Sequence, residues 1–233
     1  MAKHSKRYRA SLKQAPKTAV PLAQAIEFIK AHPGAKFDET VEVGIRLGVD
    51  PTKSDQAVRG TVSLPNGTGK HVRVIVFAAG TQADEAKAAG ADEAAFEALI
   101  EKVKGGWTEF DVAIATTDAM KEVRKLGRVL GPRGLMPNPK TGTVTDDVAA
   151  AVKAAKGGRV EFRMDRTGNV GVVAGKLSFE AGKLVENVNA ILAAVAAERP
   201  ASAKGIFIKN VTVCSTMGVG VPVVFNVGTG AAE

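Results

Sequence analysis

Residues 72–78 read V-R-V-I-V-F-A, an apolar run interrupted only by Arg73. A run of this kind is typical of a strand that is covered on both faces of its sheet. Residues 110–115, F-D-V-A-I-A, form a second such run, and helical apolar spacing occurs before it and again up to about residue 130. Strands that alternate with helices predict a small parallel α/β domain in the middle of the chain.

This middle domain is expected to close with a helix. Thr145 can cap that helix, with Asp146 and Asp147 in its first turn and apolar residues from Val148 onward on its buried face. Two consecutive glycines, at 157 and 158, then end the pattern.

Both ends of the chain show a different pattern, in which apolar residues alternate strictly with polar or small ones. Residues 41–49 and 159–164 have this period of two, which predicts half-buried strands with one wet face. The other elements expected here are helices that start at Pro21 and Ser178, a hairpin-type turn at residues 165–169, and strands at residues 58–64, 170–174, 206–213 and 221–227.

The two ends resemble each other more than either resembles the middle. We therefore expect residues 1–66 and 159–233 to fold together as one α+β domain, with residues 67–158 inserted as the α/β domain. The two crossings between the domains would form a double-stranded hinge, which can bend about one axis. The glycines assigned to this hinge are Gly67, Gly69, Gly157 and Gly158.

The charge of the chain is concentrated at its start. The net charge is +8, and residues 1–17 carry six cations and no carboxylate, so the other 216 residues carry only +2 (8 − 6). A basic arm on a nearly neutral body predicts an electrostatic tether for RNA or another polyanion. The alternative is a disordered tail that keeps the protein in solution.

The sequence offers little for catalysis or metal binding. The three histidines, His4, His32 and His71, and the single Cys214 have no metal-ligand spacing, so neither a metal site nor a cofactor is expected. The segment Gly-Thr-Gly-Lys at residues 67–70 is not a phosphate loop, because Leu64 stands where the first glycine belongs. No run reaches the roughly 20 apolar residues that a membrane span needs, and the expected location is the cytoplasm.

Residues 126–143, L-G-R-V-L-G-P-R-G-L-M-P-N-P-K-T-G-T, combine glycines and prolines with Arg128, Arg133 and Lys140. Proline stops a helix, so a constrained loop is expected after about Leu130. Two interpretations remain equally open: a loop that holds an anion, and a buried crossover between packed elements.

Two clusters near the ends suit RNA. They are K-F-D-E-T at residues 36–40 and S-T-M-G at residues 215–218. A lysine can meet a phosphate, Phe37 can stack, and hydroxyls and backbone groups can meet 2′-OH groups. On residue chemistry alone the plainer alternative is favoured, in which Phe37 belongs to the core and residues 216–218 form an ordinary turn.

The Gly/Pro stretch resembles the signature of the L1 family of large-subunit ribosomal proteins, L-G-x-x-L-G-P-x-G-L-M-P-x-P-K. The resemblance covers nearly the whole chain. Its other matches are K-F-D-E-T-V-E-V at residues 36–43, R-G-T-V-x-L-P-x-G-x-G-K at residues 59–70, E-F-R-x-D-x-T-G at residues 161–168, and S-T-M-G at residues 215–218.

This resemblance implies a discontinuous α+β domain with an inserted three-layer, Rossmann-like α/β domain, and a protein without enzymatic activity. It implies that the protein binds large-subunit rRNA in the mobile stalk near the E site, assists tRNA movement and release, and represses translation of its own operon mRNA. The implied rRNA and mRNA site is Lys36, Phe37, Thr40, Arg163, Asp165, Thr167, Thr216, Met217 and Gly218. Arg163 would meet a phosphate or be held by Asp165.

Other implied partners are E-site tRNA and further ribosomal components, with Arg128, Arg133 and Lys140 as a secondary RNA contact. The sequence departs from the family pattern at Gly171, where histidine is frequent, and at Val219, where proline often follows and where the change is expected to loosen the loop. Two alternatives stay open: an enzyme that holds a phosphate ligand in the Gly/Pro loop, and a repressor that binds messenger only.

Overall fold

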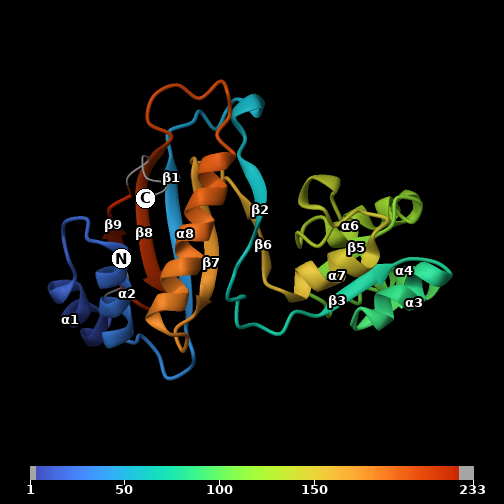
Figure 1. Ribbon diagram of the computed structural model, residues 1–233, viewed down its shortest axis with the longest axis horizontal. Helices are drawn as coiled ribbons and strands as arrows, with labels where there is room; N and C mark the ends of the chain where they lie inside the picture. The colour runs from blue at the N-terminus through green and yellow to red at the C-terminus, as the bar shows by residue number, and fades with distance from the viewer. Residues whose placement is uncertain (1–3, 226–233) are drawn as a thin grey trace. The chain divides into compact units, whose positions relative to one another are not determined.

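The computed structural model describes residues 4–225, apart from the side chains of Ser54 and Lys140, and divides into two units (Figure 1). Unit 1 combines the described residues up to Gly69 with those from Val160 onward, and unit 2 is Lys70–Arg159. The fold is mixed, with helices and several sheets, as expected.

Unit 1 is built on an antiparallel sheet with the strand order β7-β1-β8-β9. Its strands are β1 (Thr40–Leu47), β7 (Asn169–Lys176), β8 (Ile208–Ser215) and β9 (Val221–Val223). Burial alternates along β1, where Val41, Val43, Ile45 and Leu47 are buried and the residues between them are exposed. The strand with one wet face that the alternation predicts is therefore confirmed.

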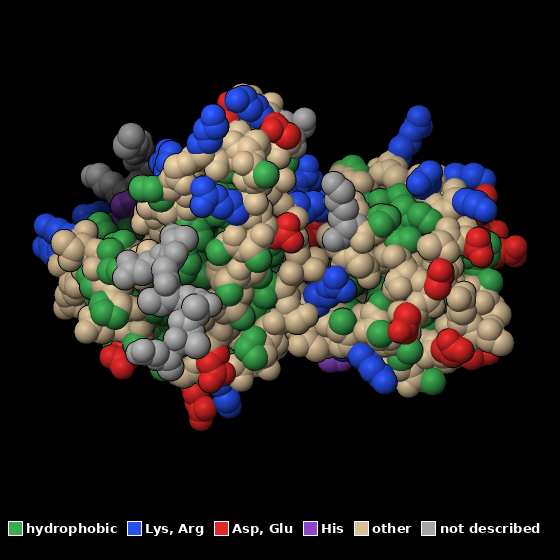
Figure 2. All heavy atoms as spheres, turned by 45° about the horizontal axis from the view of Figure 1, so that its top comes forward, with side chains coloured by type: hydrophobic (Ala, Val, Ile, Leu, Met, Phe, Trp, Pro, Cys, Tyr) green, Lys and Arg blue, Asp and Glu red, His purple; other side chains and the backbone are tan. Residues whose placement is uncertain are grey.

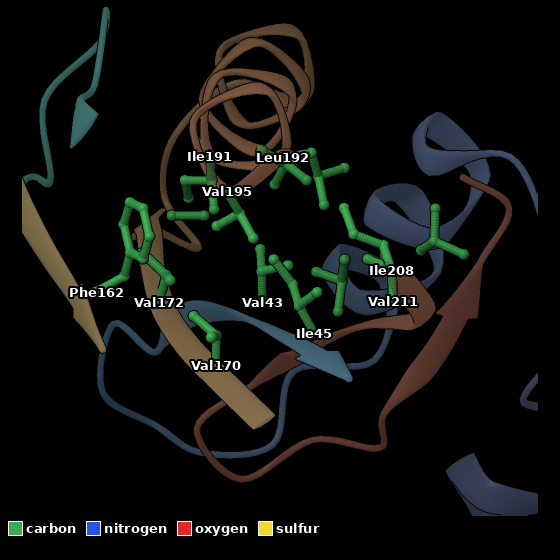
Figure 3. Close-up of a cluster of buried hydrophobic side chains, with 14 of the residues drawn as sticks. Val43, Ile45, Phe162, Val170, Val172, Ile191, Leu192, Val195, Ile208 and Val211 are labelled. Atoms are coloured by element: carbon green, nitrogen blue, oxygen red, sulfur yellow. The ribbon is translucent and has the colours of Figure 1, made fainter. Parts of the chain in front are cut away.

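Two helices, α2 (Leu22–Ala31) and α8 (Ala181–Ala197), pack on the apolar face of this sheet. In Figure 3 the side chains of Ile191, Leu192 and Val195 point from α8 toward those of Val43 and Ile45 on β1. The helix predicted to start at Pro21 is also present as α2, and its buried residues are Ala25, Ile26 and Ile29.

The remaining elements of unit 1 are α1 (Lys6–Gln14), the 3-10 helix η1 (Ser54–Gln56), and a two-stranded sheet of β2 (Arg59–Ser63) and β6 (Arg159–Arg163). The predicted turn between β6 and β7 is present, with the Asp165 N–H donating to the carbonyl of Asn169. The two strands that it joins nevertheless enter different sheets, which the sequence pattern did not indicate.

The start of α8 differs from the prediction. The helix begins at Ala181 rather than at Ser178, and Glu180 is its N-cap residue. The hydroxyl of Ser178 is occupied elsewhere, because it donates to Asp38 Oδ2 at 2.8 Å, and its N–H donates to Asp38 Oδ1 at 3.1 Å. The tertiary contact with Asp38 therefore uses the Ser178 side chain, which was predicted to cap α8.

Unit 2 contains a parallel sheet of order β4-β3-β5, made of β4 (Glu93–Ala95), β3 (Val74–Phe77) and β5 (Val112–Ala115). All four residues of β3 are buried. Val74 and Val76 face one apolar cluster, whereas Ile75 and Phe77 face another. Helices α3 (Thr81–Ala88) and α7 (Val148–Lys156) contribute to the first cluster, and α4 (Glu97–Lys104), α5 (Met120–Val123) and α6 (Gly127–Leu130) to the second.

Unit 2 differs from the sequence predictions at three points. The helix expected up to residue 130 is broken into α5, the 3-10 helix η2 (Arg124–Leu126) and α6, with Gly127 starting the last piece. Strand β4 is only three residues long and was not predicted. The cap of α7 is Asp147, whose carboxylate accepts from the Ala150 N–H at 3.0 Å, while Thr145 accepts from the N–H of Asp147 itself.

Candidate nucleic-acid interface

The two clusters predicted near the ends of the chain meet at one end of the sheet of unit 1. Strand β1 begins at Thr40 and β8 ends at Ser215, and their antiparallel register pairs Val41 with Ser215. The N–H of Thr40 donates to Thr216 Oγ1 at 3.0 Å, and the N–H of Thr216 donates back to the Thr40 carbonyl at 3.0 Å. We call residues 34–40 together with residues 215–218 the sheet-end site.

The buried side chain of Glu39 connects residues 34–40 to residues 215–218, the two segments of the sheet-end site. Its side chain is 0% exposed, and its carboxylate accepts from the N–H of Ala35 at 2.5 Å and from the N–H of Met217 at 2.9 Å. Burial by itself raises the pKa of Glu39, but the Met217 N–H, the Ser215 hydroxyl and the N–H groups of Ala35 and Gly34 together outweigh it, so the pKa lies below its ordinary value. The carboxylate is therefore ionised at neutral pH inside the protein.

The outer surface of the sheet-end site presents apolar side chains to solvent. Phe37 is 58% exposed and Met217 is 54% exposed, and Lys36 beside them is also exposed. The interpretation of Phe37 as a core residue is therefore wrong. Large apolar side chains are costly to leave in water, so an exposed pair flanked by a lysine is a candidate contact surface.

Gly218 and Val219 complete the turn. The N–H of Gly218 donates to the Ser215 carbonyl at 3.0 Å, and a Cβ added at Gly218 would lie 2.3 Å from Ser215 Oγ. Val219 is 6% exposed. The expectation that Val219 loosens the turn stays a prediction.

The neighbouring strand end supports the same region. Lys176, the last residue of β7, pairs with Thr40 across the sheet, and its ammonium group lies 3.1 Å from Thr40 Oγ1. Together with the Asp38–Ser178 contact, this fixes the sheet-end site on two sides.

Arg163, Asp165 and Thr167 lie elsewhere. Their turn adjoins the opposite end of β1, where Arg46 pairs with Asn169 and the Leu47 N–H donates to the Gly168 carbonyl. Arg46 lies six positions after Thr40 in β1, which corresponds to about 20 Å at about 3.3 Å per residue. The nine residues implied by the resemblance thus form two groups, one at each end of the sheet.

The carboxylate of Asp165 is occupied within its own turn. It accepts from the N–H of Thr167, the N–H of Asn169 and the hydroxyl of Thr167, each at 2.8 Å. The Asn169 and Thr167 bonds lower the pKa of Asp165. Among the described residues Asp165 forms no ion pair with Arg163, which is exposed, so Arg163 is not held as one expectation had it.

Between these two groups lies the wet face of the sheet, whose residues were not predicted as a site. The exposed positions of β1 are Glu42, Gly44 and Arg46, and the register sets Gly171 of β7 and Thr212 of β8 on either side of Gly44. A Cβ added at Gly171 would meet nothing within 4 Å. The alternating sequence pattern marked the face as wet, but only the strand register joins the two groups across it.

Cys214 lies on this face, paired with Glu42. Burial raises the pKa of its thiol, and the charge of Glu42 adds to the effect. A thiol with a raised pKa is a poor nucleophile. Among residues 4–225 no cluster of three or more His, Cys, Asp or Glu side chains could hold a metal ion.

The Gly/Pro loop of unit 2 is stabilised by hydrogen bonds between its own residues. Pro137 and Thr141 are buried, and the N–H of Asn138 donates to Thr143 Oγ1 at 2.8 Å, with the Thr141 hydroxyl donating to the Asn138 carbonyl at 3.0 Å. A short 3-10 helix, η3 (Pro139–Thr141), lies within it. This favours the crossover interpretation over an anion-binding loop.

The three cations of residues 126–143 differ in their surroundings, and Arg128 lies in α6. Arg128 and Arg133 are exposed, and Arg133 donates to the hydroxyl of Thr108. The side chain of Lys140 lies outside the described part of the structure. On the face drawn in Figure 2, Lys and Arg side chains form several separate groups with acidic side chains between them, so charge alone does not mark an interface.

Comparison with known proteins gives one consistent result. Residues 29–219 match the model of the Ribosomal protein L1p/L10e family. The chain is 54% identical to a large ribosomal subunit protein uL1 of Kosmotoga olearia over 222 residues, which are 95% of this chain and 96% of that protein. It is 55% identical to a uL1 protein of Corynebacterium efficiens over 225 residues, 96% of this chain and 95% of that protein. A uL1 protein of Protochlamydia amoebophila is 52% identical over 224 residues, again 96% and 95%.

Proposed function

Because the chain belongs to the ribosomal protein L1p/L10e family, we propose that it binds large-subunit rRNA through unit 1 as a structural protein of the large ribosomal subunit. Proteins of this family are structural and not enzymatic. The alternative of an enzyme that uses the Gly/Pro loop is therefore abandoned.

The observation that carries the proposal is the sheet-end site. Thr40 and Thr216 hold each other by reciprocal hydrogen bonds, and Phe37 and Met217 remain exposed on the same surface. RNA is recognised by shape, by 2′-hydroxyls and by stacking on exposed side chains. A fixed turn that carries the Thr216 hydroxyl, an exposed aromatic ring and a neighbouring Lys36 is suited to such contacts.

The wet face of the sheet extends this contact toward the second group. Glycines 44 and 171 leave the middle of the face low, which suits the close approach of an RNA backbone. The exposed Arg163 at the far end can meet a phosphate about 20 Å away from Thr40. Asp165 and Thr167 shape the turn there by their mutual hydrogen bonds.

The finer function follows the family resemblance. We propose that the bound rRNA is the mobile stalk near the E site, that the protein moves with departing tRNA, and that it represses its own operon mRNA by binding a similar RNA site. Arg128 and Arg133, exposed on unit 2, and Lys140 are the candidates for the secondary contact with tRNA. A repressor that binds messenger only is the competing function.

The crossings between the units are the proposed hinge. Gly67 and Gly69 on the first crossing have φ angles of +67° and +70°, and Gly157 and Gly158 lie just before the second. Positive φ is accessible to glycine at little cost, which gives these connections more freedom than other residues would. Such freedom supports movement of one unit against the other during tRNA release.

One binding experiment tests the proposal. The affinities of the full chain for a stalk rRNA fragment and for an operon-leader RNA are measured with Phe37→Ala and with Thr216→Val, which replaces the hydroxyl by a methyl group and so also removes the acceptor of the Thr40 N–H. We expect each variant to lose about tenfold or more in affinity for both RNAs. Thr81→Val, an exposed threonine of unit 2, is the matched control and should bind like the unchanged protein.

Two results would contradict the proposal. If Thr216→Val and Phe37→Ala bind the rRNA fragment as tightly as the unchanged protein, the sheet-end site is not the interface. If the unchanged protein binds the leader RNA but not the rRNA fragment, the messenger-only repressor is the correct function.

A further inference from the structure

Glu39 occupies an unusual position in the sheet-end site. Of the ionisable side chains in the described residues, it is the only one that is buried, and it lies directly beneath surface positions that are more than half exposed. An ionised carboxylate is costly to remove from water unless hydrogen bonds replace its hydration. The buried carboxylate of Glu39 is therefore expected to provide an interaction that an apolar side chain could not provide.

This interaction consists of the hydrogen bonds that the Glu39 carboxylate accepts from Ala35 and Met217. Oε1 accepts from the N–H of Ala35 and Oε2 from the N–H of Met217, so one carboxylate joins its own segment to a turn 178 residues further along the chain. Both donors are backbone groups of irregular segments that no strand ladder holds. Hydrogen bonds to an ionised acceptor are shorter and stronger than neutral ones, and they define direction.

The surroundings of Glu39 leave little room for another arrangement. A Cβ added at Gly34 would lie 2.7 Å from the carbonyl carbon and oxygen of Met217 and 2.9 Å from Glu39 Oε1. The backbone of residue 34 therefore packs directly against the turn that carries Met217. The reciprocal bonds between Thr40 and Thr216 hold the adjacent pair of residues.

We propose that Glu39 is the positioning residue of the RNA-binding surface: its carboxylate holds the Phe37 segment and the Thr216-Met217-Gly218 turn in one fixed arrangement before RNA arrives, without touching the RNA. This inference rests on the proposed function of unit 1. A surface that is already ordered loses less conformational freedom on binding, so its affinity is higher for the same contacts.

Glu39→Gln in the full chain tests the inference. Glutamine has the same shape as glutamate, but one of its two terminal groups is NH2 and cannot accept a hydrogen bond. One of the two backbone N–H groups, that of Ala35 or that of Met217, therefore loses its acceptor. We expect the affinity for the stalk rRNA fragment to fall by about tenfold or more. In hydrogen exchange, the amides of Ala35 and Met217 should lose protection, while those of Val43 and Val213 in the central strands keep theirs.

A matched control separates positioning from stability. Ile191→Val removes one methyl group from the core beneath the same sheet, where Ile191 is 0% exposed. It should lower the stability of unit 1 but leave the affinity for RNA unchanged at a temperature where both variants are folded. Glu39→Asp, which keeps the charge but is too short to reach both donors, is a second variant for the case that Glu39→Gln does not fold, and it should lose affinity in the same way.

The outcomes are distinguishable. The inference is overturned if the folded Glu39 variants bind the rRNA fragment as the unchanged protein does, or if Ile191→Val loses as much affinity as they do. Failure of the proposed function appears differently, because the unchanged protein would then not distinguish the rRNA fragment from an unrelated RNA duplex.

Discussion

At the scale of single residues, the sheet-end site depends on the absence of a side chain as much as on those present. Gly34 is buried, and its backbone lies against the carbonyl group of Met217. The requirement for glycine here comes from this close approach between distant segments and not from a turn.

The substitution Gly34→Ala should separate the two segments. The added Cβ would stand 2.7 Å from backbone atoms of Met217, which cannot move as a flexible side chain could. We expect unit 1 to lose about 1–3 kcal/mol of stability, as in other overpacked sites, together with affinity for rRNA. Urea unfolding followed by circular dichroism and a binding titration measure the two effects.

Gly182→Ala is the control for this change. Gly182 lies in α8, and a Cβ there would meet nothing within 4 Å. Alanine in a helix should hold or raise stability by up to about 1 kcal/mol. If both alanine variants have the same stability and the same RNA affinity, the close approach at Gly34 has no importance.

Asp111 holds the first residues of unit 2. Its carboxylate accepts from Lys70 Nζ at 2.6 Å and from the Arg73 N–H at 3.1 Å. The Lys70 hydrogen bond is the main cause that lowers the pKa of Asp111, against the opposing effect of burial. The unfolded chain binds a proton at this group more readily, so its contribution to stability is present above its ordinary pKa of 3.8 and is lost as the pH falls through the lower folded value.

We therefore expect unit 2 to lose stability as the pH falls below about 4. The single tryptophan, Trp107, packs against Phe110 in this unit, so its fluorescence during urea unfolding reports unit 2 alone. Asp111→Asn should lower stability at neutral pH by about 1 kcal/mol and make the acid dependence shallower. An acid dependence as steep in Asp111→Asn as in the unchanged protein would contradict this assignment.

At the scale of elements, helix ends show how two adequate local signals compete. Thr145, Asp146 and Asp147 can all cap a helix by residue type. The structure uses Asp147 for the cap of α7, whereas Asp146 accepts from the hydroxyl and the N–H of Thr117. The choice is made by a neighbouring loop that is 29 residues away in the sequence.

Replacing the cap gives a direct measurement. Asp147→Ala should cost about 1 kcal/mol of the stability of unit 2, because the Ala150 N–H loses its acceptor. Asp147→Asn should retain most of that stability, since asparagine caps about as well. Trp107 fluorescence during urea unfolding again provides the measurement, and equal stabilities for the two variants would refute the assignment of the cap.

At the scale of the whole molecule, the contributions of the basic N-terminal segment and of unit 2 to RNA binding can be tested separately. Residues 1–17 carry six of the cations, and α1 within them has no buried residue. Gln14 Oε1 lies 2.7 Å from Nε2 of His32, the residue that follows α2, so α1 touches the body through a polar contact. An exposed basic helix of this kind can contribute to RNA binding through phosphates alone.

Removal of residues 1–17 should therefore lower RNA affinity most at low salt. The slope of log affinity against log salt should decrease by at most about five, since each of six cations releases about 0.9 counterion. The ratio between the stalk fragment and an unrelated duplex should stay the same. An unchanged slope would exclude the arm as a tether.

Unit 1 carries the proposed rRNA site and has its own core. Replacing Lys70–Arg159 by a short Gly-Ser linker should leave circular dichroism typical of a folded protein, because the apolar cluster of unit 1 contains no residue of unit 2. Affinity for the stalk fragment should remain within about tenfold of the full chain. Complete loss of binding by a folded variant would move the interface to the inserted residues.

Much of the fold was readable because burial leaves a periodic record in a strand or helix. The alternation of residues 41–49 predicted β1, and the apolar run of residues 72–78 predicted β3. The Gly/Pro stretch and the other motifs identified the family. The chemistry of residues 36–40 and 215–218 was also visible, although on residue chemistry alone the interpretation of Phe37 as core was favoured, and the structure shows Phe37 exposed.

Tertiary structure decided which of these residues act together. Antiparallel pairing of β1 with β8 brings Thr40 to Thr216, whereas the register with β7 sends the Asp165 turn to the far end of the sheet. The role of Glu39 depends on this pairing, because one of its two donors comes from the other end of the chain. Local sequence records which face of an element is buried, but the partner of a hydrogen bond across 178 residues depends on strand register, which only the folded chain specifies.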